Sequence, residues 1–200
     1  MSNNIVYSIE SASNGLYVGG AFSQDHSGTV NLHNVGFWNG QSWQQMSGGV
    51  NGNVRAIKSS SLGVFVGGDF TKAGVSSEVD AVGLARWDGS TWHAVGETSG
   101  SVRTIEVSSN GILVGGDQFS ASVGITNAAE WDASSWNKIN GKEFNSAVYK
   151  IKSGSYGIVV AGYFTQIVSG MDVQNIDCLA HLNNNVWSGF GSINSYINDF

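Results

Sequence analysis

The polar loop over residues 23–33 holds the side chains best suited to chemistry, because it combines two of the four histidines with a carboxylate. His26, His33 and Asp25 are residue types that ligate zinc. The two histidines are seven residues apart in a loop that contains Gly and Ser, and this spacing matches no standard zinc pattern. The pattern therefore favours solvated polar side chains that can contact a ligand, and we predict no metal site.

Two other loops between apolar segments carry carboxylates. Glu78 and Asp80 lie in one, and Asp172 and Asp177 lie in the other. Neither loop has the Asp-x-Asp-x-Asp-Gly ladder of oxygen ligands that is typical of a calcium site. We treat these four residues, like those of the first loop, as candidate ligand-binding side chains, and we predict no cofactor.

The familiar signatures of catalysis are missing from the sequence. It contains no Gly-x-Ser-x-Gly, no His-Glu-x-x-His and no phosphate-binding loop. Two carboxylates that meet only in the folded chain, as in a glycoside hydrolase, are invisible at this level. We expect a protein that is not an enzyme, and a hydrolase-type activity is the third hypothesis, after two non-catalytic ones.

Composition argues against several classes of partner. Charged residues make up only 12% of the chain, and the net charge is −6. Nucleic-acid binding depends on clusters of Lys and Arg, whereas the nine basic residues here are scattered singly. The single cysteine, Cys178, excludes an internal disulfide and is expected to act as a small buried apolar residue.

The sequence predicts no membrane insertion. No apolar run approaches the length of about 18 residues that spans a bilayer. Residues 1–5 lack the basic and apolar regions of a signal peptide. The localisation is left between two alternatives, an intracellular protein or a segment of a longer secreted or cell-surface chain.

A fixed internal period organises the chain. The motif Val-x-x-Ile begins at Val6, Val54, Val102 and Val148, at spacings of 48, 48 and 46 residues. A short apolar run follows each copy and ends in Gly-Gly, which becomes Ala161-Gly in the fourth. A glycine pair here permits a close approach of two backbones or a positive φ.

Each repeat closes with two large apolar residues five positions apart. In the copy Trp-Asp-Gly-Ser-Thr-Trp (87–92), a type II′ turn centred on the Gly-Ser pair places Trp87 opposite Trp92. The fourth copy has Leu182 in place of the first tryptophan. Because these residues recur in register, we expect them to form the structural core between sheets rather than platforms for sugars. The seven tryptophans are Trp38, Trp43, Trp87, Trp92, Trp131, Trp136 and Trp187.

Four short strands fit each repeat, and no segment has the 3.6-residue periodicity of a helix. Repeats of about 40–50 residues with four strands are typical of β-propeller blades. We predict an all-β propeller, either a closed four-blade ring or part of a larger ring, in one repeat domain. Successive coils of a β-solenoid are the second choice. The expected blades are 5–50, 51–98, 99–144 and 145–192, with an extra strand over 193–200.

The order of these motifs resembles that of kelch-type repeats, in which Gly-Gly ends the second strand and an aromatic-Asp pair precedes a Trp. It is closer still to the kelch-like repeats of bacterial surface and secreted proteins and of fungal cortical polarity markers. The resemblance covers all 200 residues and departs from the pattern at Ala133, Ala161 and Leu182. Galactose oxidase-type enzymes share the kelch-like ring, but their copper site needs Cys, Tyr and His residues that have no clear counterparts here.

The number of repeats is smaller than in most kelch-like rings. Ile197-x-x-Phe200 follows Trp187 by the ten residues that separate Trp92 from Val102, so it is a fifth copy of the opening motif. The chain is then a fragment of a longer propeller, an oligomer that completes a larger ring, or a closed ring with a redundant strand. Unpaired sheet edges invite pairing with another chain, which favours the first two explanations.

The resemblance implies a non-catalytic binding or adhesion module that recognises a protein or glycan surface. Its inter-strand loops are the expected contact region, because binding residues concentrate on loops held by a rigid scaffold. The alternative is a structural unit that assembles with itself into a larger propeller or array.

Overall fold

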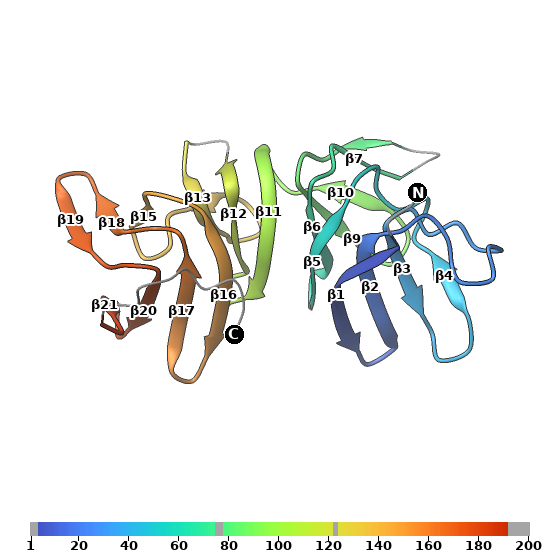
Figure 1. Ribbon diagram of the computed structural model, residues 1–200, viewed down its shortest axis with the longest axis horizontal. Helices are drawn as coiled ribbons and strands as arrows, with labels where there is room; N and C mark the ends of the chain where they lie inside the picture. The colour runs from blue at the N-terminus through green and yellow to red at the C-terminus, as the bar shows by residue number, and fades with distance from the viewer. Residues whose placement is uncertain (1–3, 75–77, 122–123, 192–200) are drawn as a thin grey trace. The chain divides into compact units, whose positions relative to one another are not determined.

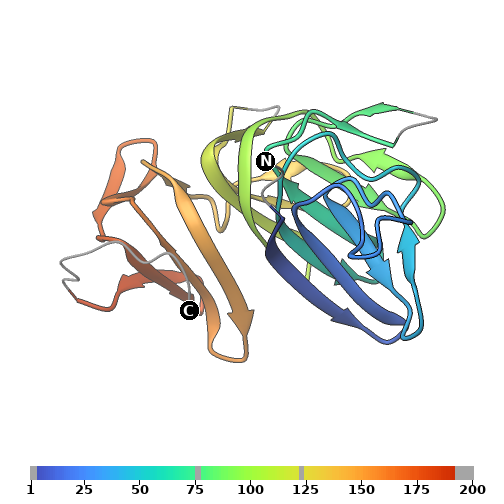
Figure 2. The same cartoon turned by 45° about the vertical axis from the view of Figure 1, so that its right-hand side comes forward.

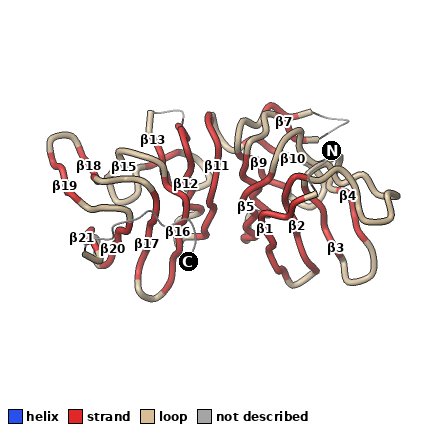
Figure 3. Tube along the Cα trace, in the orientation of Figure 1, coloured by secondary structure: helices blue, strands red, loops and turns tan. Residues whose placement is uncertain are grey.

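The computed structural model describes residues 4–74, 78–121 and 124–191, and these form β-strands, turns and loops with no helix (Figures 1 and 3). The all-β expectation is confirmed. Contacts divide the chain into two compact units, Met1–Val102 and Arg103–Phe200. Closure into a ring stays a prediction, and the expected extra strand over 193–200 lies outside the described residues.

The first unit contains two four-stranded antiparallel sheets and a small ribbon. Sheet one has the order β1 (Ile5–Ala12), β2 (Gly15–Ala21), β3 (Val35–Trp38), β4 (Trp43–Gln45). Sheet two has the order β5 (Val54–Ser60), β6 (Gly63–Gly68), β9 (Leu84–Trp87), β10 (Trp92–Ala94). The ribbon pairs β7 (Lys72–Ala73) with β8 (Val79–Asp80). Each large sheet is therefore built from one sequence repeat.

The sheets of the third and fourth repeats follow the same plan. Sheet three has the order β11 (Thr98–Val107), β12 (Ile112–Ala121), β13 (Thr126–Trp131), β14 (Trp136–Asn137). Sheet four has the order β16 (Val148–Gly154), β17 (Gly157–Gly162), β20 (Leu179–Asn183), β21 (Val186–Gly189). A three-stranded sheet has the order β15 (Glu143–Phe144), β18 (Gln166–Ser169), β19 (Asp172–Asn175).

In sheets one, two and four, the second residue of the glycine pair (Gly20, Gly68 and Gly162) lies opposite a β-bulge in the first strand of the sheet. In sheet one the register shifts between Val6 and Ser8, and Val6 pairs with Gly20. A Cβ on Gly20 would lie 1.9 Å from the carbonyl oxygen of Ile5, and Gly68 in sheet two meets its opposite strand at the same distance. Of the two reasons considered for the glycine pair, the close backbone approach is the one observed.

The first glycine lets the two sheets of one unit pack closely. A Cβ on Gly19 would lie 2.3 Å from Cγ1 of Val54 in sheet two. In the second unit, a Cβ on Gly115 would lie 2.6 Å from Cγ1 of Val148 in sheet four. The Val-x-x-Ile motif of a unit's second sheet is therefore covered by the Gly-Gly strand of its first sheet.

A side-chain hydroxyl also joins the first strands of the two sheets in each unit. The backbone N–H of Ile57 donates to Oγ of Ser8 at 3.1 Å. The backbone N–H of Ile151 donates to Oγ1 of Thr104 at 3.2 Å. Each bond satisfies a backbone donor that the sheet ladder leaves unpaired, so Ser8 and Thr104 have the same role in the two units.

The tryptophan hairpins have the predicted register. Trp87 pairs with Trp92 and the equivalent pairs form in sheets one and three, with ring centroids 5.2 to 5.5 Å apart. Leu182 pairs with Trp187 in sheet four. Less than a tenth of the surface is exposed at Trp87, Trp92, Trp136 and Trp187, whereas Trp38, Trp43 and Trp131 are half-buried.

The turns of the third and fourth hairpins differ in sequence from Trp-Asp-Gly-Ser-Thr-Trp. Gly89 has a φ of 104°, in the region that favours glycine, and Ala133 occupies the equivalent turn position with a φ of 75°. In the fourth hairpin, Asn184 and Asn185 have φ values of 49° and 62°, as a type I′ turn requires. The fourth copy has thus changed turn type, while the third retains the glycine-type geometry without the glycine.

We expect Ala133→Gly to stabilise the protein by about 0.5–1 kcal/mol, because it relieves a left-handed alanine at a small cost in unfolded-chain entropy. The reverse change, Gly89→Ala, should destabilise it by a similar amount, since no atom lies within 4 Å of the added Cβ and only the backbone is strained. Urea denaturation measures both, and a loss of stability in Ala133→Gly would contradict this account.

Trp92→Ala should cost about 3–5 kcal/mol, because it empties a site in the core between sheets one and two. The indole is 5% exposed, and its Nε1 donates to the carbonyl of Met46 at 2.7 Å. Trp43→Ala is the matched control at the equivalent, half-buried position and should cost less than half as much. Equal losses in chemical denaturation would mean that the two tryptophans are equally buried in solution.

Candidate functional site

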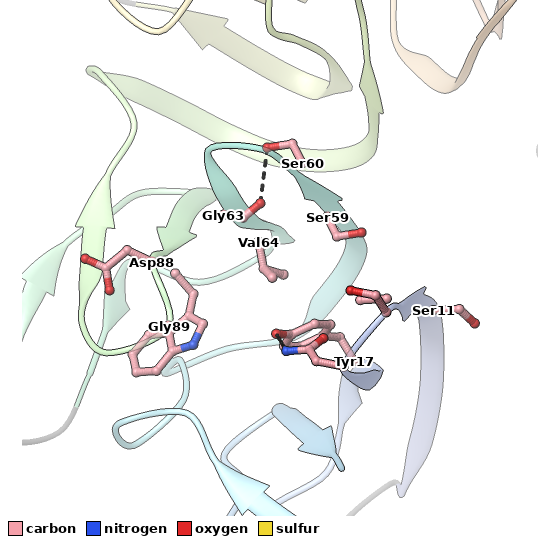
Figure 4. Close-up of a pocket in the computed structure, with 12 residues that line it drawn as sticks. Ser11, Tyr17, Ser59, Ser60, Gly63, Val64, Asp88 and Gly89 are labelled. Carbon is pink, nitrogen blue, oxygen red and sulfur yellow. Dashed lines mark hydrogen bonds between the residues drawn. The ribbon is translucent and has the colours of Figure 1, made fainter. Parts of the chain in front are cut away.

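Three turns of the first unit surround a cavity of about 590 Å³, which we call the turn cavity (Figure 4). The turns are β1–β2 of sheet one and β5–β6 and β9–β10 of sheet two. The lining residues are Ser11, Ala12, Ser13, Asn14, Tyr17, Ser59, Ser60, Gly63, Val64, Trp87, Asp88 and Gly89. The cavity therefore depends on the packing of sheets one and two, which sets the distance between their turns.

The turn cavity combines neutral hydrogen-bonding groups with an apolar part. Serine hydroxyls, the Asn14 amide and the Tyr17 phenol supply donors and acceptors, while Val64 and Trp87 supply apolar surface. Nδ2 of Asn14 lies 3.4 Å from the phenol oxygen of Tyr17. The Tyr17 ring packs on Phe37 with centroids 4.6 Å apart, and this contact holds the phenol in position.

Two serines of the cavity are oriented by neighbouring groups. Oγ of Ser59 donates to a carboxylate oxygen of Glu10 at 2.7 Å, and the Ser59 backbone N–H donates to the same oxygen at 3.0 Å. Oγ of Ser60 donates to the carbonyl of Gly63 at 3.2 Å (Figure 4). The Ser60 oxygen also accepts the backbone N–H of Leu62 at 3.1 Å. Because a hydroxyl oxygen has two lone pairs, each of the two serines keeps at least one that can accept a hydrogen bond from a ligand.

The carboxylate of Asp88 lies at the edge of the cavity and is strongly stabilised in its charged form. Nε2 of His93 lies 2.6 Å away, and the backbone N–H groups of Thr91 and Ser90 each donate at 2.8 Å. These bonds, that of His93 above all, lower the pKa of Asp88 well below its ordinary value. Asp88 thus holds the β9–β10 turn in shape and contributes a fixed negative charge.

A second cavity, of about 540 Å³, lies over the 23–33 loop and one face of sheet one, and we call it the loop cavity. Asp25 and His26 line it together with Val6 and Trp43. The carboxylate of Asp25 accepts from the Ser27 hydroxyl and from backbone N–H groups further along the loop, and these bonds lower its pKa. Asp25 therefore organises its own loop, while His26 is exposed beside it.

The structure does not bring His33 into the loop cavity with these residues. His33 has a φ of 48°, and its carbonyl accepts the backbone N–H of Val50 at 3.0 Å. Its Nδ1 is buried without a hydrogen-bond partner among the described residues. The histidine pair considered from sequence is therefore split between an exposed loop position and a half-buried position that is hydrogen-bonded to Val50.

The other acidic candidates lie at exposed positions. Glu78 lies 2.6 Å from Nζ of Lys72 across the β7–β8 ribbon, in which Lys72 pairs with Asp80. Asp172, at the start of β19, forms an ion pair with Lys142, and Asp177 is exposed near the end of the same loop region. Exposed pairs of this kind contribute little to stability, so these residues are not assembled into a site by the fold.

Within residues 4–74, 78–121 and 124–191, no three His, Cys, Asp or Glu side chains are grouped so that they could hold a metal ion. The same part of the chain has no helix with the length and apolar character needed to cross a bilayer.

Sequence reasoning selected none of the turn-cavity residues as ligand-binding side chains, and Trp87 was expected only as a core residue. The serines and Asn14 lie in or beside β-turns, where Ser and Asn are expected for conformational reasons alone. The available signal was the density of hydroxyl and amide groups in the runs Ser-Ala-Ser-Asn (11–14) and Ser-Ser-Ser (59–61). The sequence alone does not show the packing of sheets one and two, which brings these two runs together around the cavity.

Asp88→Asn should lower stability at neutral pH and have a smaller effect in acid. An Asp with a depressed folded-state pKa contributes stability above its unfolded pKa of about 3.9, and this contribution is lost as pH falls below that value. The asparagine keeps the acceptors for the turn, as Asn39 does in the first hairpin at 2.9 Å from two backbone nitrogens. Thermal denaturation of both proteins at several pH values measures the difference in their stability. A difference that does not shrink in acid would contradict this prediction.

Comparison of the chain with models of protein families and with curated proteins finds no match.

Proposed function

We propose that the protein is a non-catalytic binding module and that its turn cavity takes a neutral glycan. The observation that carries the proposal is the make-up of this cavity, in which oriented hydroxyl, amide and phenol groups surround apolar surface from Val64 and Trp87. A sugar has the matching chemistry, with hydroxyls that donate and accept and C–H groups that can contact the small part of Val64 and Trp87 that is not buried between the sheets. Pockets of this size with a few placed polar groups are the usual form of a ligand site.

The charges near the cavity support a neutral ligand over an anionic one. Asp88 is negative at its edge, and Glu10 lies directly behind Ser59. Lys58 is near Glu10, with its Nζ 4.0 Å from the carboxylate. The two serine oxygens act as acceptors, so the ligand must supply hydroxyl protons, which sugar hydroxyls do and deprotonated acid groups do not.

We also propose that the four large sheets are blades of a kelch-like propeller. One four-stranded sheet per repeat supports this, with the glycine pair at or next to the end of the second strand in β2, β6 and β17 and the tryptophan hairpin forming the last two strands. In sheet three the pair lies within β12, which continues to Ala121. Recognition of a ligand by turns at one end of such sheets agrees with the general placement of binding residues on loops of a rigid scaffold.

Binding should weaken in Asn14→Ala, because Asn14 is a polar group of the β1–β2 turn that lines the cavity and contacts Tyr17. Asn110→Ala is the matched control, since Asn110 precedes the turn glycine of sheet three in the same way. A glycan array would select neutral oligosaccharides, and calorimetric titration would measure affinity. We expect at least about a tenfold loss in Asn14→Ala, equivalent to 1.4 kcal/mol, and none in the control.

Failure of every neutral glycan to bind, or an equal loss in both variants, would overturn the assignment of the turn cavity. Tryptophan fluorescence gives an independent signal, because Trp87 lines the cavity and should respond to an occupied site.

A second candidate function is a structural unit that assembles with copies of itself. It is favoured by one observation, the exposure of apolar side chains along β1, where Val6 is 52% and Ile9 is 60% exposed. Contiguous exposed apolar residues on an edge strand are typical of an association surface.

A further inference from the structure

The first Val-x-x-Ile motif is exposed, although its copies are buried. Val6 and Ile9 on β1 are 52% and 60% exposed. The equivalent pairs are at most 5% exposed, and they are Val54 and Ile57, Val102 and Ile105, and Val148 and Ile151. β1 forms the edge of sheet one (Figures 1 and 2). The face of sheet one that carries this motif is therefore uncovered, whereas the equivalent face of each other large sheet is covered.

This face extends beyond β1, and we call it the head face, defined by Val6, Ile9, Trp38 and Trp43. Cross-strand pairing puts these four side chains on one side of sheet one. The equivalent side of sheet two, including Trp92, is part of the buried core shared with sheet one. A neighbouring sheet of the same design covers this side of sheet two. We therefore expect a sheet of the same design to cover the head face.

In the last repeat, a residue whose counterparts are buried in the other three repeats is exposed. Phe190, the third residue after Trp187, is 56% exposed and stacks on His181 with centroids 5.6 Å apart. Its counterparts Met46, Val95 and Ile139 are at most 3% exposed. In the first unit, Met46 belongs to the core between the two sheets, and its carbonyl accepts the Nε1 proton of Trp92. We call the side of sheet four with Phe190 and His181 the tail face.

Charge supports the match between head and tail faces. The residue after the motif's Ile alternates in sign along the chain, as Glu10, Lys58, Glu106 and Lys152. Within each unit the two opposite charges are neighbours, with N–O distances of 4.0 Å for Lys58 to Glu10 and 3.6 Å for Lys152 to Glu106. A sheet that follows sheet four in this series must carry a Glu, and sheet one carries Glu10.

We propose that the head face of one molecule docks on the tail face of a second copy, so that the protein associates head to tail. This contact repeats the one between sheets one and two, with Val6 and Ile9 in the place of Val54 and Ile57 and Phe190 in the place of Met46. The two faces differ, so the contact is heterologous and leads to a ring or an extended chain. The inference rests on the second candidate function and is independent of glycan binding.

Sedimentation velocity of the whole chain over a range of concentrations tests the proposal. We expect a mass above the 21.1 kDa of one chain that rises with concentration. Ile9→Gln and Phe190→Gln should each weaken association by at least about tenfold, because each places an amide in an apolar contact. Met171→Gln is the control, since Met171 is fully exposed at the β18–β19 turn and lies outside both faces.

Mixing the two variants gives a sharper result. Ile9→Gln keeps an intact tail face and Phe190→Gln keeps an intact head face, so the mixture should form a complex of two chains and grow no further. A single-chain mass at every concentration, or association that both variants leave unchanged, would overturn the proposal. Calorimetric titration of Ile9→Gln with a glycan that binds the wild type should give an unchanged affinity, which separates this outcome from failure of the glycan site.

Discussion

The close approach of two backbones at the Gly-Gly pair is the constraint on which the rest of the structure depends. The second glycine allows a bulge in the neighbouring strand to approach its backbone closely, and the first allows the next sheet of the unit to pack directly on its strand. The burial of the Val-x-x-Ile motif in sheet two, the hydrogen bond that Ser8 accepts from Ile57 and the position of Trp92 all depend on this spacing between sheets. The turn cavity follows too, because its walls belong to two sheets whose separation this contact sets.

Much of the architecture could be read from the sequence because it depends on local and repeated signals. The period gave one sheet per repeat, and the turn residues of the Trp-Asp-Gly hairpin gave the pairing of Trp87 with Trp92. The glycine pair was recognised, but its two possible reasons could be separated only when the bulge opposite Gly20 was seen. Ala133 and Asn184 show that a repeat can change its turn sequence while the strand register is retained.

The candidate site was much less accessible from sequence. Carboxylates and histidines drew attention to the long loops, where Asp25 orders its own loop and Glu78 pairs with Lys72. Tyr17, Asn14 and Ser59 carry no chemical signature by themselves, since a tyrosine in a strand and polar residues in turns are ordinary. Their combination depends on contacts between residues more than 40 positions apart, such as Glu10 with Ser59, which a single sequence does not reveal.

The alternation of Glu10, Lys58, Glu106 and Lys152 has a consequence for how such a chain can lengthen. Glu10 and Glu106 are 96 residues apart, and Ser8 and Thr104 repeat at the same distance with the same hydrogen bond. The repeating module by this measure is a pair of sheets rather than a single one. Inserting one repeat would leave one sheet without a partner of opposite charge, whereas inserting two adds a complete pair. Natural or engineered relatives of this architecture should therefore tolerate growth in even steps.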